Sequence, residues 1–148
     1  MSAPRLIGFL GAGQLGEPMV DRLLVDGHRV LVYARRAEIR SRLAAKGAAV
    51  ADSVAELARN SDVLIGCLFS DSQLRDTGLG ADGFVANAKP GSVFVSHTTG
   101  TLATLDTLQR TSVNGLTILD GPVSGTVDDI NAGTLTVLLG GTPTLWPP

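Results

Sequence analysis

The chain has 148 residues, of which 44% are hydrophobic and 18% charged, and its formal net charge is −2. This composition fits one soluble globular domain with a real core, and the charge gives no electrostatic case for binding nucleic acid or an anionic membrane. One cysteine cannot form an internal disulfide, and no apolar run approaches the ~20 residues that span a bilayer. We therefore expect the cytoplasm as the compartment.

Short apolar runs alternate along the chain with segments of helical spacing. Strands are predicted at residues 5–10, 29–34, 48–50, 63–69, 92–96, 116–119 and 134–139. Helices are predicted at residues 14–26, 38–46, 71–77 and 101–111. Ser53 and Glu56 have the spacing of a capping box at the start of a further helix. The alternation indicates an α/β fold, a doubly wound, mostly parallel sheet of the Rossmann type.

Helical spacing also assigns the buried faces of two of these helices. The helix at residues 14–26 is predicted to bury Leu15, Met19, Val20 and Leu23. The helix at residues 101–111 is predicted to bury Leu102, Leu105 and Leu108.

Gly11-Ala12-Gly13-Gln14-Leu15-Gly16 is a G-x-G-x-x-G sequence between the first strand and the first helix. In this setting Gly11 permits a tight turn, Gly13 makes room for a diphosphate, and Gly16 lets the helix approach the strand. The free amides and the partial positive charge of the helix N-terminus attract phosphate. We therefore predict a dinucleotide site at residues 11–16; the alternative is a glycine-rich turn that binds nothing.

The end of the second strand bears on which dinucleotide binds. NAD-binding domains usually place an acidic residue there, which accepts hydrogen bonds from the ribose 2′-hydroxyl. This chain has Ala34, Arg35 and Arg36 instead, and two guanidinium groups suit a 2′-phosphate. NADP is therefore the predicted cofactor and NAD the second choice. The alternative is that both arginines are simply solvated.

Three stretches together resemble the β-hydroxyacid dehydrogenases, which include 3-hydroxyisobutyrate dehydrogenase. These are residues 7–19 followed by Gly27-His28, residues 96–101 (SHTTGT), and residues 120–125 (DGPVSG) leading to residues 132–135 (AGTL). The likeness covers residues 6–141. Two positions depart from the family pattern: Ser96 stands where an acid is frequent, and Thr126 where glycine is frequent.

The resemblance implies roles for residues outside the glycine loop. It places Leu68 and Thr98 beside the cofactor, and Val123 beside the nicotinamide ring. Ser124 and the amide of Gly125 would bind the carboxylate of a small hydroxy acid, which suits a turn with free amides. The alternative is that Ser124 only caps the following helix.

No metal site or histidine-based catalysis is predicted. The two histidines are far apart in the sequence, and with one cysteine they show no zinc spacing. We interpret His28 as structural and His97 as a packed or solvated residue at a strand end. Cys67 is expected to behave as a small buried hydrophobe.

The resemblance also implies parts that are missing from this chain. Similar enzymes transfer the hydroxyl proton with a lysine on the helix after the cofactor domain, but here the last lysine is Lys89 and no Lys, Arg or His follows Arg110. We therefore expect residues 1–141 to be an NAD(P)-binding domain and residues 142–148 an atypical proline-rich tail. The family's C-terminal all-helical domain and its catalytic lysine would be absent from this truncated chain, and association into a homo-oligomer stays open.

Two alternatives to a 3-hydroxy acid dehydrogenase stay open. An imine reductase is similar in residues 10–16 and in residues 98–101, though residues 120–125 match that group less well. The other alternative is a catalytically inactive dinucleotide-binding module.

Overall fold

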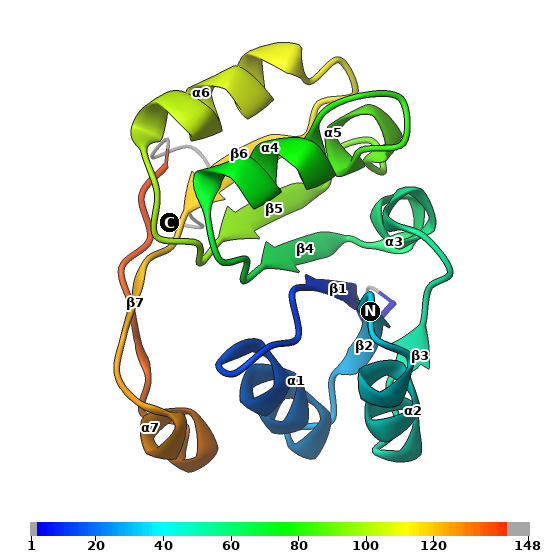
Figure 1. Ribbon diagram of the computed structural model, residues 1–148, viewed down its shortest axis with the longest axis vertical. Helices are drawn as coiled ribbons and strands as arrows, with labels where there is room; N and C mark the ends of the chain where they lie inside the picture. Colours follow the sequence, from blue (N-terminus) through cyan, green and yellow to red (C-terminus); the bar gives the residue numbers. More distant parts are fainter. Residues whose placement is uncertain (1–2, 142–148) are drawn as a thin grey trace.

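The computed structural model describes residues 3–141, with a parallel sheet at its centre (Figure 1). The strands are β1 (Leu6–Leu10), β2 (Arg29–Tyr33), β3 (Ala49–Val50), β4 (Val63–Gly66), β5 (Val93–Ser96) and β6 (Thr117–Asp120). They form one six-stranded sheet in the order β3-β2-β1-β4-β5-β6, and every neighbouring pair is parallel. The order changes direction between β1 and β4, so the predicted doubly wound α/β fold is confirmed.

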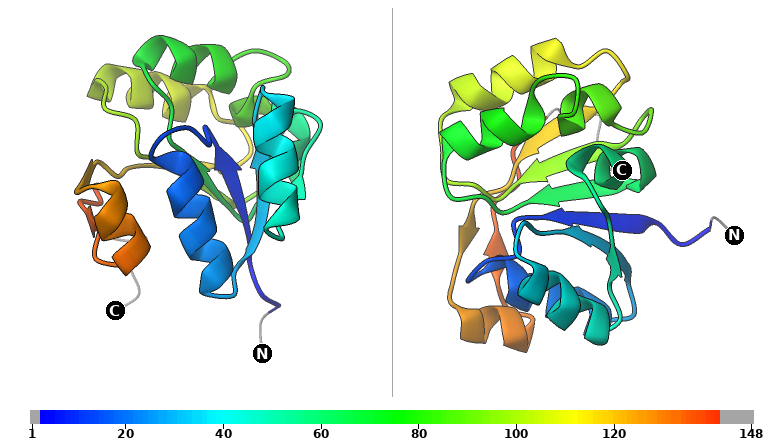
Figure 2. Two further views of the ribbon diagram at one scale, coloured as in Figure 1. Left: turned by 60° about the horizontal axis from the view of Figure 1, so that its bottom comes forward. Right: turned by 45° about the vertical axis from the view of Figure 1, so that its right-hand side comes forward.

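Helices cover both faces of this sheet (Figures 1 and 2). One face carries α1 (Gly16–Val25) and α2 (Ala37–Ala45). The other carries α3 (Val54–Asn60), α4 (Asp71–Gly78), α5 (Phe84–Asn87) and α6 (Leu102–Thr111). After β6 the chain forms β7 (Val123–Ser124), α7 (Val127–Ala132) and β8 (Thr136–Val137). These last strands pair antiparallel in a separate sheet, and α7 lies against α1.

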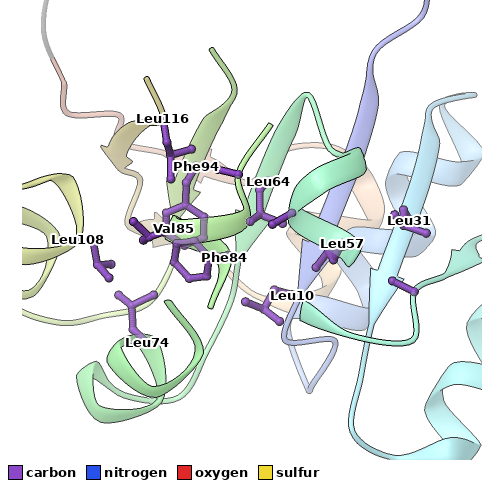
Figure 3. Close-up of a cluster of buried hydrophobic side chains, with 13 residues drawn as sticks. Leu10, Leu31, Leu57, Leu64, Leu74, Phe84, Val85, Phe94, Leu108 and Leu116 are labelled. Carbon is purple, nitrogen blue, oxygen red and sulfur yellow. The ribbon is translucent and has the colours of Figure 1, made fainter. Parts of the chain in front are cut away.

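Side chains of the central strands alternate between two cores, because successive residues of a strand point to opposite faces. Phe9 and Val32 pack with α1 and α2, whereas Leu10 and Leu31 pack with the helices on the opposite face. Both faces of each central strand are therefore apolar, which explains the continuous hydrophobic runs. In the larger core the rings of Phe84 and Phe94 stack, with centroids 4.3 Å apart (Figure 3).

The helix ends confirm some local predictions and correct another. The hydroxyl of Ser53 accepts a hydrogen bond from the amide of Glu56, as expected for an N-cap. The Glu56 carboxylate, however, bonds the amide of Asp52, so the predicted capping box is only half formed. A complete capping box occurs at Thr126 and Asp129, at the start of α7, which the hydrophobic pattern did not predict.

Two leucines assigned to buried helix faces are exposed. Leu102 is 73% exposed because Thr101 is the N-cap of α6, which puts Leu102 at the first helical position, outside the packed turns. Leu15 is 37% exposed because it precedes α1 as its N-cap. The remaining assignments agree with the structure: Met19, Val20 and Leu108 are buried, and Leu23 and Leu105 pack against a core.

Two predicted strands are shorter than expected, and one lies in a different sheet. β4 ends at Gly66, and Phe69 is 91% exposed, because the chain turns there toward Ser70, the N-cap of α4. The segment at residues 134–139 contributes only β8, which reverses along β7 after Gly133 ends α7 in the left-handed region. The short helix α5 was not predicted, and the tail at residues 142–148 lies outside the described residues.

Candidate dinucleotide-binding site

The loop between β1 and α1 needs glycine at its two ends for reasons of packing. Gly11 has a positive φ of 92°, and a side-chain carbon there would lie 2.3 Å from the carbonyl oxygen of Cys67. A side-chain carbon at Gly16 would lie 2.1 Å from the carbonyl oxygen of Gly11. These two glycines let β1, the loop and α1 pack closely, as predicted.

Gly13, in contrast, is not required by the protein's own packing. Apart from its two chain neighbours, no atom of residues 3–141 would lie within 4 Å of a side-chain carbon there, and its φ is outside the left-handed region. The residue faces open space at the surface. The absence of a side chain at this position therefore leaves room outside the backbone, where a ligand can approach.

Free amides surround this open position. Leu15, the N-cap of α1, makes no side-chain capping bond. Within residues 3–141, the amides of Gln14 and Leu15 have no hydrogen-bond acceptor, whereas the amide of Gly13 bonds the Gly11 carbonyl at 2.9 Å. Unpaired amides and the positive end of the α1 dipole together favour an anion at this helix terminus.

A hollow of about 380 Å³ lies between α1 and α2, beside the glycine loop. The residues that line it are Ala12, Gly13, Gln14, Glu17, Pro18, Asp21, Arg36, Ile39 and Arg42. The hollow therefore joins part of the glycine loop to one of the two arginines that follow β2. The spacing of the sequence did not reveal its lining residues on α1 and α2, because the two helices meet only through tertiary packing.

The segment after β2 presents two unpaired cations. Arg35 and Arg36 are exposed, and among the residues that the structure describes neither has a carboxylate within 4 Å. Arg36 is also the N-cap of α2 and makes no side-chain capping bond. Ala34 is buried, and its carbonyl oxygen accepts a hydrogen bond from Arg40, a contact that the sequence analysis missed.

An ion-pair network connects α1 with α2 beside the hollow. Arg42 binds Glu17 through two nitrogens, and the Nη2–Oε2 distance is 2.8 Å. Lys46 binds Asp21 at 2.8 Å and lies 3.6 Å from Glu17. The hydrogen bond from Arg42 holds the pKa of the Glu17 carboxyl below its ordinary value.

This lowered pKa predicts a pH-dependent contribution to stability. The Glu17 ion pair should stabilise the fold above the ordinary pKa of glutamate, and the effect should vanish as pH falls through the lowered pKa. We expect Glu17→Gln to lower the Tm by about 1–2 °C at pH 7, since partly exposed pairs are screened by solvent. Thermal melts across the acid range should show the two proteins converging at low pH; a constant difference would contradict the assignment.

Leu68 and Thr98 meet at the carboxyl edge of the sheet. The amide of Leu68 donates to the hydroxyl of Thr98 at 3.0 Å, and a Leu68 side-chain atom lies close to Gly11. Thr98 is buried, so its hydroxyl ties the segment after β4 to the segment after β5. The structure thus brings these two predicted residues together with the first glycine of the loop.

The three predicted substrate-binding residues lie on the separate hairpin. Val123 packs in the core cluster that contains Ala12, whereas Ser124 and Gly125 are exposed. Ser124 is not a helix cap, because Thr126 caps α7. The amide of Gly125 has no acceptor within the described part of the chain, but the amide of Thr126 already donates to Asp129.

The other chemically notable side chains have structural contacts. His97 is half-buried, and its Nδ1 is hydrogen-bonded to the carbonyl oxygen of Gly121. Burial raises the pKa of the Cys67 thiol, and His28 is exposed.

Across residues 3–141, no three His, Cys, Asp or Glu side chains group as metal ligands. No helix in that range has the length and apolar character needed to cross a bilayer.

Comparison with known proteins agrees with this geometry. The family model for the NAD-binding domain of 6-phosphogluconate dehydrogenase matches residues 6–147. The 3-hydroxyisobutyrate dehydrogenase of Pseudomonas aeruginosa is 35% identical over 136 residues, which are 91% of this chain and 46% of that protein.

Two solved structures are also similar. The Mycobacterium tuberculosis 3-hydroxyisobutyrate dehydrogenase, solved with L-serine, has a TM-score of 0.85 at 31% identity, over 96% of this chain and 48% of that one. Psf3, solved with NADP+ and 2-OPP, has a TM-score of 0.85 at 28% identity, over 94% of this chain and 50% of that one. The chain thus spans about half the length of these proteins.

The doubly wound sheet and the glycine loop at its switch point define the class of dinucleotide-binding α/β domains. Within that class, the chain belongs to the β-hydroxyacid dehydrogenase family and corresponds to its N-terminal cofactor-binding domain.

Proposed function

We propose that this chain binds NADP(H), with the diphosphate at residues 11–16 and the adenosine 2′-phosphate at Arg35 and Arg36. The observation that carries the proposal is the hollow that places Arg36 beside Gly13 and Gln14. Free amides offer hydrogen bonds to the diphosphate, and the second strand is followed by Ala34 rather than by an acid that would repel a 2′-phosphate. NAD remains the competing ligand.

The remaining predicted residues extend this site toward the reacting end of the cofactor. We propose that Leu68 packs against the bound cofactor and that Thr98 holds the nearby backbone in place. For a small 3-hydroxy acid, the hydroxyl of Ser124 and the free amide of Gly125 would bind the carboxylate, with Val123 beside the nicotinamide. The Thr126 amide already donates to the carboxylate of Asp129, which lies next to Gly125. This amide is therefore not a third donor for the substrate carboxylate.

Bound nicotinamide supplies hydride transfer, and the residues of this chain would bind and orient the reactants. Moving the hydroxyl proton needs a separate group. The resemblance assigns this role to a lysine after the cofactor domain, and this sequence has no lysine after Lys89. We therefore expect the 148 residues by themselves to bind the dinucleotide without turnover.

Paired titrations test the cofactor assignment. We expect the wild-type chain to bind NADPH about tenfold or more tightly than NADH, because two unpaired guanidinium groups attract the extra phosphate. Arg35→Ala/Arg36→Ala should abolish this preference and change the Kd for NADH less than about twofold. Nucleotide fluorescence measures both constants. The matched control is Arg110→Ala, an exposed arginine paired with Asp106 on α6. Equal or tighter binding of NADH by the wild-type chain would contradict the NADP assignment.

An activity assay tests the separation of binding from turnover. With a panel of 3-hydroxy acids and NADP+, we expect no change in nicotinamide absorbance, even at cofactor concentrations that saturate the chain in the titrations. Cyclic imines with NADPH form a second panel for the imine reductase alternative. Robust oxidation of a 3-hydroxy acid by this chain would contradict the expected inactivity, whereas imine reduction would favour that alternative.

A further inference from the structure

A third arginine contacts the segment that carries Arg35 and Arg36. Arg40 lies on α2, and its Nη1 donates to the carbonyl oxygens of Ala34 at 2.6 Å and of Arg35 at 2.9 Å. The side chain is half-buried, and among residues 3–141 no carboxylate lies within 4 Å of it. Its charge is therefore directed at backbone oxygens.

These two carbonyls determine the backbone conformation at Arg35. One belongs to the peptide plane before this residue and the other to the plane after it. Since each peptide unit is rigid, holding both planes restrains φ and ψ of Arg35 and the direction of its Cα–Cβ bond. The second plane also enters Arg36, whose side chain lines the hollow beside the glycine loop.

The same contacts affect the electrostatics of the segment. Carbonyl oxygens carry partial negative charge, and an unrestrained loop can turn them toward an approaching phosphate. Arg40 keeps both of them on its own side, so that the guanidinium groups of Arg35 and Arg36 are offered to the anion without opposing dipoles. Holding the loop in this conformation before binding also removes part of the entropy that ordering it would cost.

We propose that Arg40 is a positioning residue that sets the preference for NADPH over NADH by holding Arg35 and Arg36 in place. The inference rests on the proposed function, since it concerns the same 2′-phosphate. Arg40 is expected to act through its neighbours, because its Nη1 bonds two carbonyls of the segment that carries them. Its loss should therefore matter only while Arg35 and Arg36 are present. Direct contact of its other nitrogens with the phosphate would instead give additive losses in a double-mutant cycle.

A double-mutant cycle separates this role from direct binding. The Kd values for NADPH and NADH are measured for the wild type, Arg35→Ala/Arg36→Ala, Arg40→Ala and the variant that combines all three changes, with Arg110→Ala as the control. We expect Arg40→Ala to raise the Kd for NADPH about tenfold and that for NADH less than about twofold. In the Arg35→Ala/Arg36→Ala background the same change should alter the Kd for NADPH less than about twofold. Arg40→Lys, which retains a cation able to reach the carbonyls, should restore part of the preference.

The outcomes distinguish the inference from the proposed function. An equal loss for NADPH and NADH, or fully additive losses in the cycle, would show a general structural role or direct contact and overturn the inference. If Arg35→Ala/Arg36→Ala abolishes the preference and Arg40→Ala leaves it intact, only the inference fails. A wild-type chain that binds neither nucleotide overturns both. Thermal melts check folding, and Arg40→Gln replaces Arg40→Ala in the cycle if the alanine variant unfolds.

Discussion

A Gly13→Val variant is expected to keep the stability of the wild-type chain and to lose at least about 100-fold in affinity for both NADPH and NADH. The structure separates the two effects, because in the described part of the chain only the two neighbouring residues lie within 4 Å of a side-chain carbon at Gly13, and φ there is not positive. A valine would instead occupy the space in which the diphosphate approaches the loop amides.

Titration with both nucleotides and a thermal melt measure these two quantities. Gly13→Ala should give an intermediate affinity, since it adds a single carbon at the same place. Gly16→Ala is the contrasting variant: its new carbon would lie 2.1 Å from the Gly11 carbonyl oxygen, so the fold itself should be destabilised. Wild-type affinity in Gly13→Val would exclude the diphosphate from this loop and contradict the proposed function.

Phe94→Ala is expected to have the largest effect on stability, a loss of about 3–5 kcal/mol. Phe94 is fully buried at the centre of the larger core, where its ring stacks on Phe84 and packs over Gly66. Removing it opens a cavity between β4, β5 and α5 that rigid neighbours cannot fill. For a domain of this size the Tm should fall by about 10 °C.

Leu102→Ala is the matched control for the core substitution. The helical pattern assigned this leucine to a buried face, but it is 73% exposed. Its truncation should therefore change the free energy of unfolding by less than about 0.5 kcal/mol. Chemical denaturation of both variants provides the comparison. A loss at Leu102 similar to that at Phe94 would mean that α6 packs differently from this structure.

Local signals predicted most of the α/β order. Gly27 and Gly47 both follow helices and adopt positive φ, as their positions after helical segments suggested. The central strands were recognisable because both of their faces are buried. Hydrophobic spacing did not predict the segments that leave the parallel sheet, β7 and β8. A two-residue strand in a hairpin has too little periodicity to identify its partner.

The amino-acid sequence alone identified the glycine loop and the two arginines after β2, because each is a pattern of residues that lie within a few positions of one another. Tertiary structure alone decided that Arg36 lies beside Gly13 and that Arg42 pairs with Glu17 across two helices. It also decided that the Arg40 side chain turns back to hold the segment before it. Hydrophobic spacing identifies the face a helix buries, but the packing of α1 and α2 on the shared sheet decides which polar groups meet.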